Sequence, residues 1–157
     1  MPAMINKLLT AILLYATLIS CNKDDDAGPS YNFKDQLLSG KIDNETFVHG
    51  DGFFDNDDEE TVRIVLTVAQ AHDLCEVIQE GNEVFFYIDK EEKLTKLGDN
   101  QTITLLKDGS PPYNIFATSG AIEITSITET SISGRIDARV DNESFVNGNF
   151  TVYSCPH

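Results

Sequence analysis

The chain has 157 residues and carries 26 acidic against 11 basic side chains, which gives a formal net charge of -15. This charge disfavours binding to nucleic acid and to anionic membrane surfaces, because like charges repel. The length fits one domain with a core of its own, and the absence of Trp counts against a glycan platform without excluding a glycan partner.

The N-terminal segment has the features of a secretory signal. Lys7 precedes an apolar run over residues 8–19 that only two Thr residues interrupt. A membrane-spanning helix needs about 20 residues, so the run is too short to span and fits a signal peptide over residues 1–20. The alternative is a buried helix of a cytosolic protein. The polar sequence Asn-Lys-Asp-Asp-Asp after Cys21 argues against it.

The end of this segment reads Leu18-Ile19-Ser20-Cys21 and resembles the lipobox of bacterial lipoproteins. The resemblance implies that the Cys21 thiol is diacylated, that the chain is cut before Cys21, and that the new amine is acylated. Two or more acyl chains hold a protein stably at a membrane, whereas one does so only marginally. We therefore expect a protein that is bound to the membrane through its lipid.

The charge run after the cysteine is a candidate address. Lys23, Asp24, Asp25 and Asp26 resemble the export signal of Bacteroidota lipoproteins, which implies a place on the outer face of the outer membrane. The alternative is a solvated spacer. We predict that residues 21–35 form the lipidated cysteine and a flexible tether.

Residues 36–157 predict a single β domain. Apolar residues alternate with polar ones and are rich in Val, Ile, Thr, Phe and Tyr. Strands are predicted over 61–68, 83–88, 101–106, 113–118, 120–127, 130–140 and 144–153. The alternation breaks over residues 70–80, which predict one short helix. The fold expected is all-β, an antiparallel sandwich or up-and-down barrel of about eight strands with one short helix.

One phrase occurs twice. Residues 43–50 read DNETFVHG, and residues 141–148 read DNESFVNG. Asp and Asn suit hairpin turns because they hydrogen-bond their own backbone and tolerate positive φ. We predict two hairpins that meet to close a barrel or a sheet edge, with Phe47 and Phe145 in the core and a bend at the last glycine of each copy. The repeat therefore indicates architecture and not a duplicated chemical site.

Two cysteines remain after Cys21, namely Cys75 and Cys155. Outside the cytoplasm such a pair predicts one disulfide. A loop of about 80 residues would be stabilised by roughly 4–5 kcal/mol in the chain-entropy account. A zinc site lacks a histidine pair at the required spacing, and a catalytic thiol lacks an orienting partner.

The most acidic stretch is a weaker candidate for a metal site. Asp55, Asp57 and Glu59 alternate along it and could supply oxygen ligands to Ca²⁺. The EF-hand pattern fails, because the sixth position counted from Asp55 is Glu60 and not Gly. We favour a solvated hairpin loop over residues 51–60 and expect no other cofactor.

The function expected is non-catalytic: a lipid-anchored, surface-exposed domain that binds a small ligand, a glycan or a partner protein. The alternatives are a structural or envelope-assembly lipoprotein without a small ligand, and a hydrolase with two facing carboxylates. An open apolar barrel mouth would favour the first function, and a filled interior the second. The histidines, His49, His72 and His157, lie in unrelated segments.

The ending of the chain, over residues 146–155, carries a further resemblance. It reads VNGNFTVYSC and is similar to the ending of a group of small Bacteroidota lipoproteins. This resemblance supports the expected fold and location, and it implies no activity.

Overall fold

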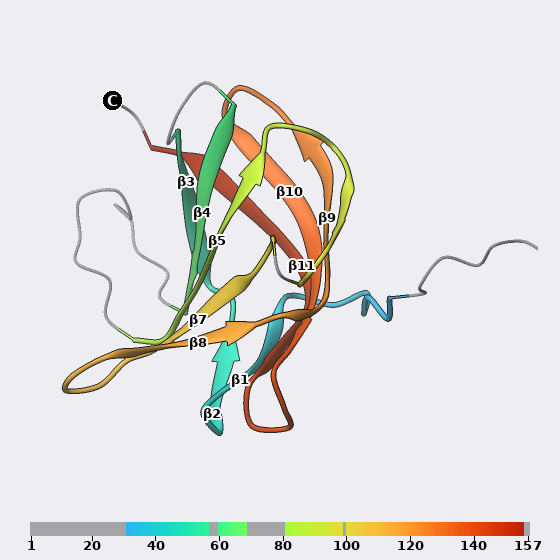
Figure 1. Cartoon of the computed structure of the whole chain (residues 1–157). Coiled ribbons are helices and arrows are strands. Elements are labelled where there is room, and N and C mark those ends of the chain that lie inside the picture. Colours follow the sequence, from blue (N-terminus) through green and yellow to red (C-terminus); the bar gives the residue numbers. More distant parts are fainter. Residues whose placement is uncertain (1–30, 57–59, 69–80, 99, 156–157) are drawn as a thin grey trace, which may run out of the picture. The chain divides into compact units, whose positions relative to one another are not determined.

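The computed structural model describes residues 31–56, 60–68, 81–98 and 100–155, and their regular structure is entirely β (Figure 1). They belong to a compact unit that begins at Tyr31. The strands are β1 (Ser39–Ile42), β2 (Glu45–Val48), β3 (Asp51–Asn56), β4 (Thr61–Thr67), β5 (Glu83–Asp89), β6 (Leu94–Lys96), β7 (Ile103–Lys107), β8 (Tyr113–Ala117), β9 (Ser119–Ile127), β10 (Ser131–Arg139) and β11 (Phe145–Ser154). The all-β prediction is confirmed. The helix predicted over residues 70–80 lies outside the described ranges, and within them no helix is suited to crossing a membrane.

The eleven strands form one curled sheet in the order β6-β9-β10-β11-β3-β4-β5-β7-β8. The pairings are antiparallel except that between β11 and β3, which is parallel. The sheet also forks at β11: β1 pairs with its first residues, 145–147, and β3 pairs with its last, 153–154. The arrangement is therefore a curled mixed sheet and not an up-and-down barrel, because β1 is too short to cover the ten residues of β11.

Strand β3 corrects the interpretation of the acidic stretch. Residues 51–56 form a strand that pairs with β4 along its whole length, although we predict a solvated loop there. Phe54 is only 6% exposed and belongs to the core, while Asp51 and Asp55 alternate with it on the other face. The apolar centre of the segment and the pairing with β4 outweigh its acidic composition.

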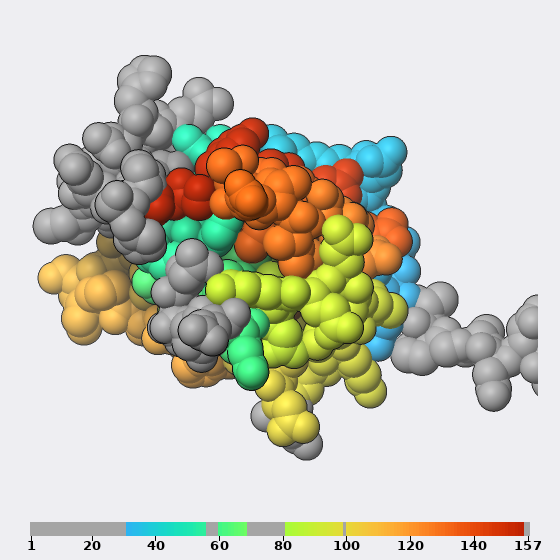
Figure 2. All heavy atoms as spheres, turned by 90° about the horizontal axis from the view of Figure 1, so that it is seen from above, coloured from blue at the N-terminus to red at the C-terminus, as the bar shows by residue number. Residues whose placement is uncertain are grey.

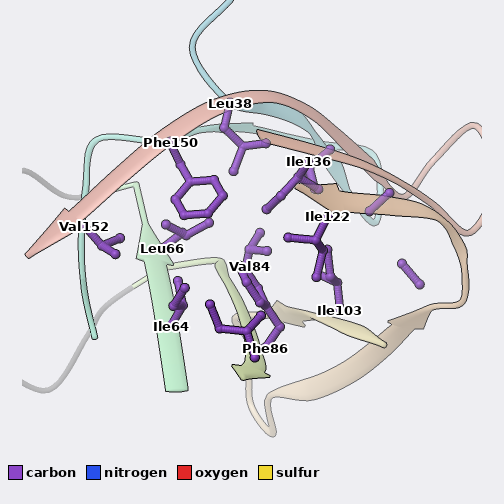
Figure 3. Close-up of a cluster of buried hydrophobic side chains, with 14 of the residues drawn as sticks. Leu38, Ile64, Leu66, Val84, Phe86, Ile103, Ile122, Ile136, Phe150 and Val152 are labelled. Atoms are coloured by element: carbon purple, nitrogen blue, oxygen red, sulfur yellow. The ribbon is translucent and has the colours of Figure 1, made fainter. Parts of the chain in front are cut away.

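The hydrophobic core fills the inside of the curl (Figure 3). Of the residues predicted on one face of residues 61–68, Val62, Ile64 and Leu66 lie in this core, whereas Val68, which follows β4, is 37% exposed. The ring of Phe86 meets that of Phe150 edge-on, with 5.9 Å between centroids. Burial of one such side chain contributes about 1.5–3 kcal/mol relative to an exposed position. These contacts join strands that are distant in the sequence.

The two copies of the repeated phrase meet, as predicted. Strand β1 pairs with the start of β11, and the turn of the first copy contacts the loop of the second. The Asn44 amide donates to the Glu143 carbonyl over 2.9 Å, and the Asp43 amide donates to the Ser144 hydroxyl over 3.0 Å. The repeated segments thus join the first and last hairpins of the folded unit.

The turns of the two copies differ. Asp43 and Asn44 have φ of 49° and 65°, and they form a two-residue hairpin turn of the type predicted. The second copy has a longer loop over residues 140–144, in which the Asp141 carboxylate accepts from the amides of Glu143 and Ser144. The same Asp-Asn pair therefore serves two turn types.

The two phenylalanines also differ. Phe47 is 0% exposed, as predicted, but Phe145 is partly exposed and lies 5.2 Å from the Arg139 guanidinium. The core placement of Phe145 is wrong because β11 turns Val146 and every second residue after it inward. That alternation leaves Phe145 on the outer face.

The folded unit begins before the end of the predicted tether. The Asn32 amide donates to the Asp137 carboxylate over 3.1 Å, and the Lys34 amide donates to Asn147 Oδ1 over 2.8 Å. The Asn147 amide group in turn donates to the Asn32 carbonyl and to Asp137, each over 2.9 Å. Residues 31–35 are thus held on β10 and β11.

Candidate functional site

The fork in the sheet leaves a hollow beside β11. On the side of β11 away from β10, the pairing with β1 ends at Asn147 and the pairing with β3 starts at Tyr153. The β11 residues between these two points have no named strand on that side. Leu37 forms one isolated parallel bridge with Asn149 there. The fork hollow measures about 360 Å³ and is lined by Leu37, His49, Gly50, Asn149, Phe150 and Thr151.

Gly148 allows the chain to pass so close to β11. Its φ is 139°, a conformation that other residues rarely adopt. A Cβ at this position would lie 2.7 Å from the Gln36 carbonyl oxygen and 2.8 Å from that of Leu37. This backbone conformation lets residues 36–38 pass beside β11, where Leu37 lines the fork hollow.

His49 lies in the linker between β2 and β3 and also lines the fork hollow. Its amide donates to the Leu38 carbonyl over 2.9 Å, and the next amide, of Gly50, donates to the Thr67 carbonyl over 2.8 Å. The linker is therefore held from both sides. The imidazole is 6% exposed, and its Nδ1 is buried without a hydrogen-bond partner among the described residues. Leaving such an atom unpaired destabilises the folded protein by about 1–3 kcal/mol, so an unpaired Nδ1 is unusual in a folded protein.

Burial lowers the pKa of the His49 imidazole below its ordinary value of 6.5. Hydrogen bonding to the backbone of Thr151 and of Thr67, together with the nearby Asp51 carboxylate, opposes this effect. The ring is therefore neutral at pH 7. A neutral imidazole carries one hydrogen, and the tautomer with that hydrogen on Nε2 leaves the unpartnered Nδ1 as an acceptor.

A second polar cluster lies where the β1–β2 hairpin meets β5, β7 and β8. The Lys107 ammonium contacts the Glu45 carboxylate at 3.0 Å, and Asn82 donates to the same oxygen over 3.2 Å. Tyr113 donates to Asp43 over 2.5 Å. The contacts with Lys107 and Asn82 lower the pKa of Glu45, and the bond to Asp43 raises that of Tyr113. These groups satisfy one another, so the cluster acts as a polar seam that holds the hairpin against the sheet.

Glu83 is the described carboxyl group with a raised pKa. Burial is the main cause, the nearby Asp108 adds to it, and Arg63 opposes it. Two neighbouring carboxyl groups with separated pKa values are a feature of hydrolases. Neither Glu83 nor Asp108 lines the fork hollow or two further hollows in the described ranges. These two carboxyl groups therefore lend no support to the hydrolase alternative.

The predicted site residues fall mostly outside the described ranges. Cys21, the charge run over residues 23–26 and Cys75 all do, as do Asp57 and Glu59. Asp55 lies on β3 opposite Arg63. No three potential metal ligands come together in the residues that the structure describes, and the Ca²⁺ site remains untested.

Cys155 follows β11, and its amide donates to the Phe54 carbonyl over 3.5 Å. It is disulfide-bonded, with a partner outside the described residues. Pairing with Cys75 therefore stays a prediction.

The fork hollow has no motif in the sequence. Its one signal is the repeat, which aligns His49 with Asn147 and so marks a position where the two copies differ. The chain matches no protein-family model, no curated protein and no solved structure.

Proposed function

We propose that the chain is a non-catalytic binding domain, held at the outer membrane by lipid on Cys21, that takes a small hydroxyl- or amine-bearing ligand in the fork hollow. The observation that carries the proposal is His49, a buried neutral imidazole whose Nδ1 has no partner among the described residues, at the wall of an open hollow. A donor group on the ligand would supply that partner. A small adjustment of the ring would bring Nδ1 to it. The membrane anchor and the exposure at the cell surface rest on the sequence resemblances alone.

The lining of the hollow supports binding over catalysis. Acid–base catalysis by the imidazole needs a nucleophile or a second titratable group that also faces the hollow. The Asp51 carboxylate is near the ring but is not one of the lining residues. Among the lining residues the Thr151 hydroxyl is the one nucleophile, and it is paired with the Ser133 hydroxyl at 2.9 Å. Leu37, Asn149 and Gly50 offer apolar contact and amide groups, which suit recognition.

A structural role in the envelope is the second candidate, because the inside of the curl is filled. Buried side chains such as Leu38, Phe47 and Phe86 occupy the place where a lipocalin-like barrel would hold a ligand. A ligand of this protein would therefore bind outside this filled interior, as in the fork hollow, and a chain that binds none would serve as a rigid surface module.

Binding can be tested on the mature lipoprotein in detergent micelles. The probes are methyl glycosides of common monosaccharides and small amino alcohols, added one at a time while the amide NMR signals of Gly50, Asn149 and Thr151 are followed. We expect at least one probe to shift these signals. The matched control is His49→Phe, which keeps an aromatic ring but removes both nitrogens, and it should lose the response. If no probe shifts them, or if the variant responds equally, the site is not a binding site.

Anchoring needs a separate test. Cys21→Ser should release the protein from the membrane fraction. Replacing residues 23–26 by Ala should leave a lipidated protein that faces the periplasm. Protease treatment of intact cells reports the second effect. Retention of the Cys21→Ser protein in membranes would contradict the proposal of a lipid anchor. Equal protease access to the wild type and the Ala variant would mean that the charge run is only a spacer.

A further inference from the structure

Strand β8 is an open edge of the sheet. It pairs with β7 on one side, and no described strand or backbone hydrogen bond occupies its other side. The unpaired amides and carbonyls of such an edge can accept another strand. The tip of the β7–β8 hairpin projects from the body of the sheet (Figure 1), and three of the five residues of β8 are exposed. Figure 2 shows the same molecule from above.

The opposite end of the sheet is protected, and β8 is not. Strand β6 has only three residues, contains Lys96 and follows Lys93. Short length and lysine are two devices by which proteins block edge pairing. Strand β8 has five residues, Tyr-Asn-Ile-Phe-Ala, and none is charged. Tyr113 is 47% exposed and Phe116 is 56% exposed, so the edge offers apolar contact as well as backbone groups.

One end of β8 is negatively charged. Tyr113 donates to the Asp43 carboxylate, and Glu45 and Asp108 lie close to the same end. Lys107 opposes Tyr113 across the hairpin, but its ammonium is engaged by Glu45. Two of the three acidic charges therefore remain uncompensated. A strand that carries Lys or Arg at this end would complement them.

We propose that β8 is a docking edge for an extended segment of a partner protein, which has alternating apolar side chains and a basic residue and adds to the sheet as a further strand. This partner surface goes beyond the small-ligand site at the fork. A second copy of the chain is the less suitable occupant, because each copy brings a formal charge of -15.

The test uses the mature lipoprotein in detergent micelles and a fluorescein-labelled peptide, Lys-Val-Thr-Val-Thr-Val-Thr-Lys. We expect saturable binding by fluorescence anisotropy, slower hydrogen exchange of the β8 amides, and loss of binding when Glu replaces both Lys of the peptide. Phe116→Lys, which adds a blocking charge on the edge, should weaken binding by roughly tenfold or more. Tyr153→Lys is the matched control, because Tyr153 is 59% exposed but lies on an internal strand, and it should bind as the wild type does.

Asn114→Lys, at a second exposed position of β8, guards against a folding defect in the first variant. Three results would overturn the proposal. The first is that the peptide fails to bind, and the second is that it binds both lysine variants of β8 as well as the wild type. The third is that the wild type dimerises in sedimentation experiments and Phe116→Lys abolishes the dimer, because the occupant would then be a second copy.

Discussion

The two copies of the repeated phrase differ at only two positions, Thr46 against Ser144 and His49 against Asn147, yet they do different work. The first copy makes a two-residue turn and buries its phenylalanine, whereas the second makes a longer loop and leaves its phenylalanine partly exposed. The partner strands and the loop length set these outcomes, since a shift of one residue reverses the face of every side chain in a strand.

The second differing position, Asn147 against His49, has a structural role in one copy and a proposed binding role in the other. Asn147 is 3% exposed, and both atoms of its side-chain amide are hydrogen-bonded to the N-terminal segment or to Asp137. His49 is equally buried, but its Nδ1 has no partner in the described ranges. A satisfied buried amide stabilises the fold, and an unsatisfied imidazole is tolerated at a cost. We take that cost as the mark of a binding site.

Replacing the two phenylalanines should give the largest difference in the free energy of unfolding between the two copies. Phe47→Ala removes a fully buried ring and should lower the free energy of unfolding by about 3–5 kcal/mol. Phe145→Ala removes a partly exposed ring stacked on Arg139 and should cost about 1 kcal/mol or less. Urea unfolding followed by circular dichroism measures both. Equal losses would mean that the two rings are equally buried in solution.

Substitutions of the buried polar residues should have the next largest effect on the free energy of unfolding. Asn147→Ala leaves the Lys34 amide and the Asn32 carbonyl without their partner and should cost about 1–3 kcal/mol. Asn149→Ala is the control, because its one side-chain bond, to Asp35, is exposed. His49→Phe should be neutral within about 1 kcal/mol, because it also removes an unpaired nitrogen. A loss as large as that of Asn147→Ala would make His49 a structural residue.

The fold was predictable where the signal is local. Alternation in Thr61–Thr67 identifies β4 and its buried face, and Asp43-Asn44 identifies the hairpin turn. Strand β3 was missed because its acidic ends hide an apolar centre. The parallel pairing of β11 with β3 and the fork have no local signal, since they depend on residues far apart in the chain.

The candidate site was less predictable for the same reason. His49 becomes buried only because residues 36–38 cross Gly148 and the linker after β2 is held at Thr67. None of these contacts is visible as a motif. The one sequence signal is the difference between His49 and Asn147 in the repeat, and it does not by itself indicate a site.

The pH dependence of stability should differ between the wild type and His49→Phe. The pKa of His49 is lowered in the folded protein, so below about pH 6.5 the unfolded chain binds a proton that the folded chain does not. The free energy of unfolding should therefore fall as the pH decreases, by at most about 1.4 kcal/mol per pH unit for one proton. His49→Phe should lack this slope. The raised pKa of Glu83 acts in the opposite sense in both proteins and cancels in the difference. An identical slope would contradict the neutral buried imidazole.

The turns should give the smallest contrast. Asn44→Gly relieves a positive φ and should be neutral or stabilising by about 0.5 kcal/mol. Asn142 has no positive φ, so Asn142→Gly should be destabilising by a similar amount through the entropy of the unfolded chain. Thermal melts of the two variants show the signs, and the same sign in both would mean that the turns are alike.

The proposed binding site depends on a neutral His49 imidazole whose Nδ1 can accept a hydrogen bond at the fork of the sheet. Titration of the mature lipoprotein with ¹⁵N-labelled histidine, followed by long-range ¹H–¹⁵N NMR, observes both ring nitrogens directly. We expect a pKa of His49 below the ordinary 6.5, with Nδ1 unprotonated at pH 7. A pKa at or above 6.5, or a hydrogen on Nδ1 at pH 7, would contradict it.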